Sequence, residues 1–309
     1  TGIAERRIAS SDICASDLCF EAASKLLDEM SIGRASIDML IFVSQTPDYR
    51  LPPTATILQE RLGLAKSTGA FDLNLGCSGY VYGLSTAFSY LSSEGINRIL
   101  LLAGDTLSKF ISPKDKATSL LFGDGGTATL IEKRKDSGGS YFSLNSDGAG
   151  QEILKVKAGG CRFPSNSETL REKEHENGSI RSDEQMFMDG VEIFNFILRE
   201  IPGDIANILN HSHTKLEDID AVVYHQANKM ITDYLTKKLK YPSERVPSSL
   251  HKFGNTSVLS IPLTIVSELK EKLAAGRHKT ILCGFGVGLS WATALLEFSG
   301  CHVSDLIEV

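Results

Sequence analysis

The sequence lacks paired cysteines and long apolar runs. Its six cysteines are scattered and form no Cys-x-x-Cys pair, which suggests neither a disulfide framework nor a zinc site and favours a reducing, cytoplasmic setting. No apolar run reaches the ~18 residues of a membrane-spanning helix, and residues 1–8 lack the apolar centre of a signal peptide. Because the chain does not begin with methionine, we expect further sequence upstream.

The sequence also lacks an excess of positive charge. A net charge of -6 and a pI near 5.7 give no electrostatic basis for binding nucleic acid or an anionic membrane. What is present is ample apolar content, 42% of 309 residues. This predicts two ordinary domains or one large layered domain with a sizeable core.

An internal repeat spans about half the chain. Residues 36–43 open with Ile-Asp before a strand-like apolar run, and residues 218–225 do the same; each follows a helical pattern, expected near 16–30 and 189–209. The first helix is expected to start at a Ser/Asp cap. Cys77-Ser-Gly corresponds to Asn255-Thr-Ser, and residues 122–130 resemble 285–295. Four correspondences in one order predict a duplicated β-α unit.

Strands that alternate with helices predict an α/β fold of mostly parallel sheets covered by helices. The expected parts are an N-terminal half at 1–132, an intervening segment at 133–185 with an exposed, mobile polar insertion around 166–178, and a C-terminal half at 186–309. Because ligands bind beyond the carboxyl ends of such strands, Cys77, His225, Asn255 and the turn at 285–288 should converge.

Cys77 is the candidate nucleophile. It lies between an apolar run and a helical pattern and is flanked by Gly76 and Ser78-Gly79, which permit a sharp turn and a close approach to the sulfur. A helix N-terminus favours a thiolate. The alternative for a free cysteine is a buried, space-filling role.

Two further residues fit the chemistry of a nucleophilic thiol. His225 ends a predicted strand, and Asn255 occupies the repeat position of Cys77; both can donate hydrogen bonds to a carbonyl oxygen. The structural alternatives are a strand-end histidine without a chemical role and a helix-capping asparagine. The turn at 284–288 can offer backbone N–H groups, or it can simply reverse the chain.

These motifs together resemble the β-ketoacyl-acyl carrier protein synthase III family of the thiolase-like superfamily. The resemblance covers nearly the whole chain and includes Cys77-Ser-Gly; the four motifs that are most specific together are Phe122-Gly-Asp-Gly125, His225-Gln-Ala-Asn228, Gly254-Asn-Thr-Ser257 and the Gly-rich close with Ser290-Trp291. It implies a thiolase-like fold of two duplicated β-α halves, with stacked mixed sheets between helix layers. The family's first strand would precede Thr1.

The resemblance also implies roles for individual residues. The family's catalytic triad falls on Cys77, His225 and Asn255, and its oxyanion hole on the backbone N–H groups of Cys77 and Val287. The substrate pocket would include Phe285, Gly286 and, reaching across a homodimer interface, Leu51. Carrier-protein docking would fall on Lys237 and Lys238, although a solvated helix face is nearly as good an explanation.

The implied reaction is a decarboxylative Claisen condensation. An acyl group passes from acyl-CoA to Cys77, and malonyl-acyl carrier protein then loses CO2 and attacks it to form a β-ketoacyl-carrier protein. The resemblance implies no metal and no organic cofactor. Two departures, Met230 in place of a family arginine and Val191 in place of a family asparagine, suggest a specialised carrier or pathway.

Other functions fit the residues less well. An acyltransferase of the same fold would pass the acyl group to a hydroxyl or an amine, but it would need a base rather than the second oxyanion donor, Asn255. A degradative thiolase needs a second catalytic cysteine, and Cys283 lies one residue out of register. A non-catalytic partner subunit would have lost Cys77. His211 and His213 suggest an exposed loop rather than a metal site.

Overall fold

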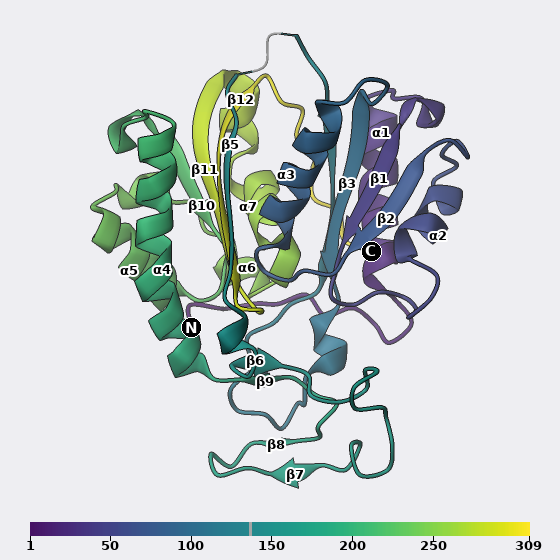
Figure 1. The fold of residues 1–309 in the computed structure, drawn as a ribbon, viewed down its shortest axis with the longest axis vertical. Coiled ribbons are helices and arrows are strands. Elements are labelled where there is room, and N and C mark those ends of the chain that lie inside the picture. Colours follow the sequence, from purple (N-terminus) through teal and green to yellow (C-terminus); the bar gives the residue numbers. More distant parts are fainter. Residues whose placement is uncertain (136–137) are drawn as a thin grey trace.

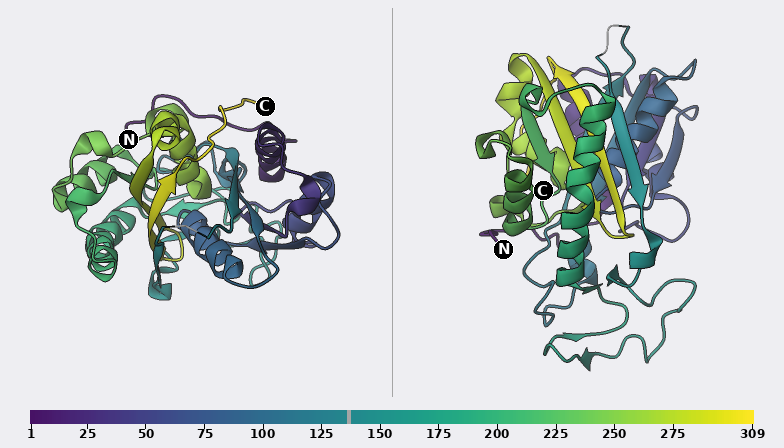
Figure 2. Two further views of the ribbon diagram at one scale, coloured as in Figure 1. Left: turned by 90° about the horizontal axis from the view of Figure 1, so that it is seen from above. Right: turned by 60° about the vertical axis from the view of Figure 1, so that its left-hand side comes forward.

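Two four-stranded sheets stand side by side in the computed structural model, with helices between them and on both outer faces (Figures 1 and 2). The structure describes residues 1–135 and 138–309. None of the helices within these ranges is long and apolar enough to cross a membrane. The expected α/β architecture of two sheets between helix layers is confirmed.

The first sheet has the order β2-β1-β3-β4. Strand β1 pairs in parallel with β2 and β3, whereas β4 runs antiparallel to β3. Two helices cover its outer face. The elements are β1 (Met39–Val43), β2 (Gly69–Leu73), β3 (Arg98–Asp105), β4 (Gly125–Glu132), α1 (Ala15–Glu29) and α2 (Thr54–Arg61).

The second sheet has the order β10-β11-β12-β5, and two helices cover its outer face. Its parallel β10–β11 pair and antiparallel β11–β12 pair repeat the pairing of β1, β3 and β4, as a duplication predicts. Strand β5, from the segment expected between the halves, completes this sheet. The elements are β5 (Tyr141–Ser146), β10 (Ala221–Tyr224), β11 (Arg277–Gly286), β12 (Ser290–Ser299), α4 (Gly190–His211) and α5 (Lys229–Leu239).

Burial on both faces explains the unbroken apolar run of β1. Ile41 and Val43 pack into the central layer, while Leu40 and Phe42 pack against the outer helices α1 and α2. A strand covered on both sides cannot alternate apolar with polar residues, because neither face meets water. The central layer holds α3 (Gly79–Leu91), α6 (Leu250–Phe253), α7 (Ser260–Glu268) and α8 (Lys270–Ala275).

Helix α1 starts differently from the expectation of a Ser/Asp N-cap. Its cap position is Cys14, and the carboxylate of Asp17 accepts a hydrogen bond of 2.8 Å from the Cys14 backbone N–H. The acidic residue thus acts from inside the first turn, where it also complements the helix dipole. The expected helix near 189–209 is confirmed as α4.

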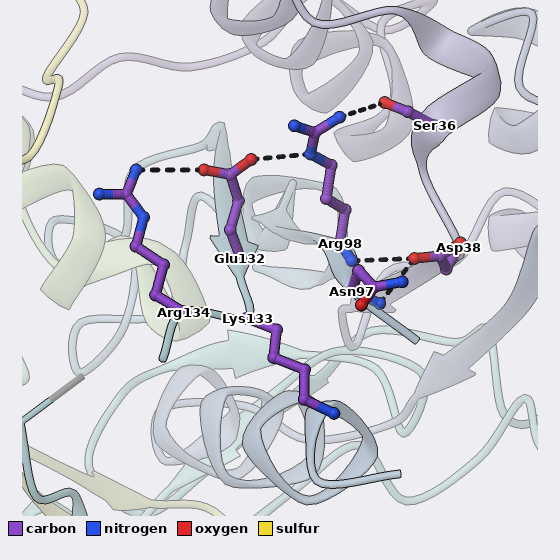
Figure 3. A pocket seen from close by; sticks show the side chains of 7 residues that line it. All are labelled: Ser36, Asp38, Asn97, Arg98, Glu132, Lys133 and Arg134. Carbon is purple, nitrogen blue, oxygen red and sulfur yellow. Dashed lines mark hydrogen bonds and ion pairs between the residues drawn. The ribbon is translucent and has the colours of Figure 1, made fainter. Parts of the chain in front are cut away.

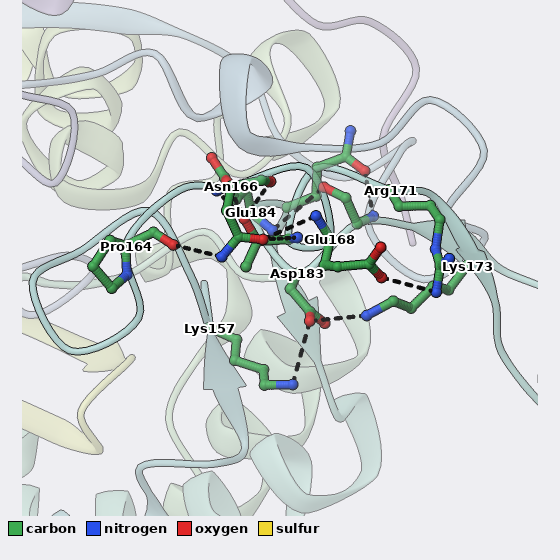
Figure 4. A network of polar contacts seen from close by, with 11 residues as sticks. Lys157, Pro164, Asn166, Glu168, Arg171, Lys173, Asp183 and Glu184 are labelled. Carbon is green, nitrogen blue, oxygen red and sulfur yellow. Dashed lines mark hydrogen bonds and ion pairs between the residues drawn. The ribbon is translucent and has the colours of Figure 1, made fainter.

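The segment between the halves, together with the first residues of the C-terminal half, forms two small strand pairs and a polar network (Figure 4). Asp183 accepts hydrogen bonds from Lys157 and Lys173, and Glu184 accepts one from Thr169. The expected exposure of residues 166–178 is largely confirmed; residues 136 and 137 lie outside the described ranges. The strands are β6 (Leu154–Lys155), β7 (Lys173–Glu174), β8 (Ile180–Arg181) and β9 (Phe187–Met188).

Candidate active site

Cys77 lies in the turn that carries the chain from β2 into α3. Its side chain is only 7% exposed, and Ser78 occupies the N-cap position of the helix. The end of β11 passes directly over it, because a Cβ atom added to Gly286 would lie 2.9 Å from the Cys77 sulfur. Only glycine at position 286 leaves room for this approach.

The surroundings of the Cys77 sulfur favour the neutral thiol. Burial raises the pKa of Cys77 to about 12, and the charge of Asp105 adds to the rise. The hydroxyl of Ser257 and the backbone N–H groups of Cys77 and Val287 act in the opposite direction. The expectation that the helix N-terminus favours a thiolate is therefore wrong for this state, because desolvation outweighs the helix dipole.

His225 directly follows β10 and is buried. Its Nδ1 lies 2.7 Å from the Ser260 hydroxyl, and its ring meets that of Phe285 edge-on at 5.6 Å. Burial lowers the pKa of His225 to about 3, although the backbone of Ser257 partly offsets this. The ring is therefore neutral at pH 7. If Nδ1 accepts the Ser260 proton, Nε2 carries the ring proton and can donate it.

Asn255 lies after α6 and is held by its backbone and its side chain. Its N–H donates to Leu121 and its carbonyl accepts from Gly123, while Oδ1 accepts a 2.9 Å hydrogen bond from the Ser257 N–H. The last contact is a local turn and not the helix cap considered as the structural alternative, because the N-cap of the short helix Ser257–Leu259 is Thr256. It also fixes the amide orientation, so that Nδ2 remains as the donor.

The three candidates converge on one residue, Ser257. Its hydroxyl lies beside the Cys77 sulfur, its backbone beside the His225 ring, and its N–H on Asn255. The chain reversal at Val287 is held in place because Ser290 Oγ donates to the Val287 carbonyl and contacts Ser78 Oγ at 2.7 Å. The three residues thus surround Ser257, but only His225 directly follows a strand, whereas Asn255 comes after the helix α6.

Other predicted residues lie elsewhere. Leu51 is 84% exposed on the loop before α2, and Lys237 and Lys238 are exposed in the last turn of α5. Met230 and Val191 are also at the surface, at the starts of α5 and α4. These residues could act in this site only through a partner molecule.

Cys283, His211 and His213 lie in surroundings that fit structural roles. Cys283 is fully buried in the layer beneath α4, where the Thr293 hydroxyl donates to its sulfur and burial raises its pKa. His211 and His213 are exposed at the end of α4, as expected.

A surface pocket lies at the opposite end of the first sheet from Cys77 (Figure 3). Its charged groups bind one another: Arg98 pairs with Glu132 at 2.7 Å, and Asp38 accepts from the backbone of Asn97 and Arg98. These contacts tie the strand ends together and explain the pocket without a ligand.

Sequence reasoning missed Asp105, Ser257 and Ser260. Asp105 ends a strand whose preceding residues are apolar, and a polar residue at the carboxyl end of such a strand is itself a signal for the site. Ser257 lies within the Gly254-Asn-Thr-Ser257 motif. No pattern in the sequence places either side chain next to Cys77.

Two family models match the chain. The model for 3-oxoacyl-(acyl-carrier-protein) synthase III matches residues 71–150, and that for the C-terminal part of the same family matches residues 209–298. A β-ketoacyl-(acyl-carrier-protein) synthase III from Caldanaerobacter subterraneus is 36% identical over 303 residues, which cover 97% of this chain and 88% of the relative. One from Clostridium perfringens is 36% identical over 96% of this chain and 88% of its own length.

Solved structures agree in fold. A 3-oxoacyl-(acyl-carrier protein) synthase from Burkholderia xenovorans superposes with a TM-score of 0.92 at 42% identity, covering 100% of this chain and 86% of its own. The priming β-ketosynthase of a polyketide biosynthetic pathway superposes with a TM-score of 0.82 at 28% identity, covering 97% and 87%.

Proposed function

The chain belongs to the 3-oxoacyl-(acyl-carrier-protein) synthase III family, and on that premise we propose that it condenses an acyl-CoA primer with malonyl-acyl carrier protein. The product is a β-ketoacyl-carrier protein. The observation that carries this proposal is the meeting of a buried thiol, a neutral histidine and an oriented asparagine amide around Ser257. The enzyme is a transferase, with Cys77 as the residue that holds the acyl group.

The first half-reaction forms the acyl-enzyme. The Cys77 sulfur attacks the thioester carbonyl of acyl-CoA, and the oxygen gains negative charge as the tetrahedral intermediate forms. The backbone N–H groups of Cys77 and Val287, which already face the sulfur, are the proposed oxyanion hole. Free CoA then leaves, and the acyl group stays in the pocket beside Phe285 and Gly286.

The second half-reaction forms the carbon–carbon bond. Loss of CO2 from the malonyl group places negative charge on its thioester oxygen, and His225 Nε2 and Asn255 Nδ2 are the proposed donors to that oxygen. A neutral, buried histidine suits this role because it donates without needing to be ionised. The carbanion comes from the substrate itself, so we propose that no metal or organic cofactor takes part.

The acyltransferase alternative is not favoured. Passing the acyl group to an alcohol or an amine requires a base to deprotonate the acceptor. His225, with a pKa near 3 in its buried position, is a weak base. Asn255 has no proton-accepting role in such a reaction.

The function is tested by mass spectrometry of the intact protein after incubation with a panel of acyl-CoAs, followed by addition of malonyl-acyl carrier protein. We expect one class of acyl group to be retained and then released as a β-ketoacyl-carrier protein. Transfer of the retained group to an added alcohol or amine, without CO2 release, would support the alternative. The panel also identifies the primer.

We further propose a homodimer in which Leu51 closes the acyl pocket of the partner subunit. The base of its loop is held by Asp72, whose carboxylate accepts hydrogen bonds of 2.7 Å from the N–H groups of both Thr54 and Ala55. A leucine that is 84% exposed on an anchored loop is well placed to be buried by a second copy.

Leu51→Phe is therefore expected to shorten the longest acyl chain that is accepted, because the larger ring fills the end of the pocket. Sedimentation should give a dimer for both proteins, and the acyl-CoA panel should show the shift. Leu170→Phe, at another exposed leucine, serves as the control and should leave the preference unchanged. A monomeric wild type, or an unchanged preference in Leu51→Phe, would contradict this assignment.

The carrier protein is proposed to dock at α5. Lys237, with Lys229 and Lys240, lines a groove of about 760 Å³ beside this helix, and Lys238 is exposed next to it. An acidic carrier would be drawn to this side by charge. At the start of α5, Met230 is 69% exposed and adds an apolar contact in place of a fixed charge.

Reversing two of these charges tests the docking site. The double variant Lys237→Glu, Lys238→Glu should raise KM for the carrier about tenfold and weaken the salt dependence, with little change in acylation by acyl-CoA. Lys215→Glu, in the exposed connection before β10, is the control.

Met230→Arg should improve the use of a fatty-acid carrier protein if the enzyme serves a specialised carrier protein. If the wild type already works well with the fatty-acid carrier protein and Met230→Arg brings no gain, a specialised carrier is excluded.

We place the enzyme in the cytoplasm. All six cysteines are free thiols, and the proposed substrates, acyl-CoA and acyl carrier protein, are intracellular thioesters.

A further inference from the structure

A buried carboxylate and a buried hydroxyl lie behind the nucleophile without complete hydrogen bonding. Asp105 ends β3 and is 0% exposed; its Oδ1 accepts from the Gln45 N–H at 2.7 Å and from the Ser44 hydroxyl at 3.1 Å. Within the described part of the chain, its Oδ2 makes no hydrogen bond of ordinary geometry, although the Val258 N–H acts to lower the pKa of the carboxyl; the Ser257 hydroxyl makes no such bond either. Buried polar atoms without partners are rare and often mark functional sites.

Ser257 lies between the two groups. The short helix η6 (Ser257–Leu259) packs against both β3, which carries Asp105, and α3, which follows Cys77. The Ser257 hydroxyl is near enough to affect the pKa of both Cys77 and Asp105, although it makes no hydrogen bond of ordinary geometry in the resting state. Its φ of 53° is a conformation that serine rarely adopts, as is common where function constrains the backbone.

We propose that Ser257 and Asp105 form a proton relay that deprotonates Cys77 during acylation. The substrate in this inference rests on the proposed function, whereas the choice of residues rests on the geometry behind Cys77. As the sulfur–carbon bond forms, the Cys77 proton passes to Ser257 Oγ, and the Ser257 proton passes to Asp105 Oδ2. The bond to the CoA sulfur then breaks, the CoA thiolate takes a proton from solvent, and Asp105 returns its proton to solvent.

The charge balance favours this route. A thiol beside a carboxylate and a thiolate beside a carboxylic acid carry the same net charge, so the relay adds no charge to the buried site. Burial raises the pKa of Asp105 to about 6, which leaves the carboxylate ionised and able to accept a proton at pH 7. In this relay Ser257 exchanges protons with the reacting sulfur directly, whereas Asp105 acts through Ser257 as a positioning and proton-accepting residue.

Among the groups around Asp105, Cys77 is the one that can supply it with a proton during the reaction. The titratable neighbours are two thiols, Cys77 and, from α1, Cys19, and the negative charge of Asp105 raises the pKa of both. Strand β1 and its end supply Ser44 and the Gln45 N–H, and β4 places Gly125 opposite Asp105. Cys19 is fully buried among apolar side chains, so it cannot meet a substrate.

The test measures the alkylation rate of Cys77 by iodoacetamide from pH 5 to 9, with peptide mapping to separate Cys77 from the other thiols. This readout needs neither acyl-CoA nor carrier protein, so it stands even if the proposed function fails. The wild-type rate should rise through a midpoint near pH 6. Asp105→Asn and Ser257→Ala should each slow the reaction at pH 7 about 100-fold and abolish this midpoint. Single-turnover acylation should slow in parallel.

Two results would overturn the relay. If Asp105 merely repels the thiolate, Asp105→Asn lowers the pKa of Cys77 and alkylation becomes faster, which overturns the relay. An unchanged rate in Ser257→Ala overturns it as well. Ser44→Ala separates this role from a merely structural one, because loss of its hydrogen bond should move the midpoint to higher pH while the plateau rate is retained. Circular dichroism of each variant establishes that it is folded.

Discussion

Cys77→Ser is expected to abolish retention of an acyl group and to reduce condensation by about 10⁴-fold or more, because no other residue at the site can form the thioester. Mass spectrometry of the intact protein after acyl-CoA treatment should show the acyl adduct on the wild type alone. The buried, neutral thiol at the end of β2 is proposed to be the reacting group.

Cys14→Ser is the matched control for this result. Cys14 is also a free thiol at the start of a helix, α1, but it lies outside the site and is partly exposed. Its replacement should leave acylation and condensation unchanged. An acyl label that peptide mapping located on Cys14, Cys19 or Cys283 would refute the assignment of Cys77.

His225→Ala and Asn255→Ala should each lower the rate of malonyl decarboxylation by about 10²–10³-fold, since each removes one preorganised donor to the developing oxyanion. Both variants should still form acyl-Cys77, because the proposed oxyanion hole of that step is built from backbone N–H groups. Release of CO2 from malonyl-acyl carrier protein, measured with pre-acylated enzyme, separates the two half-reactions.

The pH profile tests the state of His225 in the same assay. With its pKa lowered to about 3 by burial, the ring is already neutral above pH 5, so decarboxylation by pre-acylated enzyme should show no histidine midpoint near 6.5. His213→Ala and Asn210→Ala, at exposed positions, are the controls. Loss of acylation with decarboxylation intact would instead support the acyltransferase reaction.

Local patterns were enough to predict the elements that carry the site. The apolar run at 39–43 has neighbours on both faces of its sheet, and the expected helices correspond to α1 and α4 within one to two residues at each end. The repeat predicted that Asn255 occupies the position equivalent to Cys77. These features depend on backbone periodicity and on turn residues, which neighbouring residues largely determine.

The ionisation of the site could not be predicted from the same patterns. A cysteine before a helix suggests a thiolate, yet the structure buries Cys77 beneath Gly286 and beside Asp105, and its pKa rises. Desolvation depends on what covers the residue, and the covering atoms here come from the other half of the chain. The neutral state of His225 also comes from burial, in its case against Ser260 and Phe285 of its own half.

The sequence by itself determined the α/β class, the duplication and, through its motifs, the family and the three residues of the candidate triad. Only the tertiary structure determined which polar groups are buried next to Cys77. Asp105 and Ser257 are separated by about half the chain, and they meet because η6 packs against β3. The electrostatic balance of a buried thiol is set by such through-space neighbours, whose distances and solvent exclusion exist only once the two sheets have packed together.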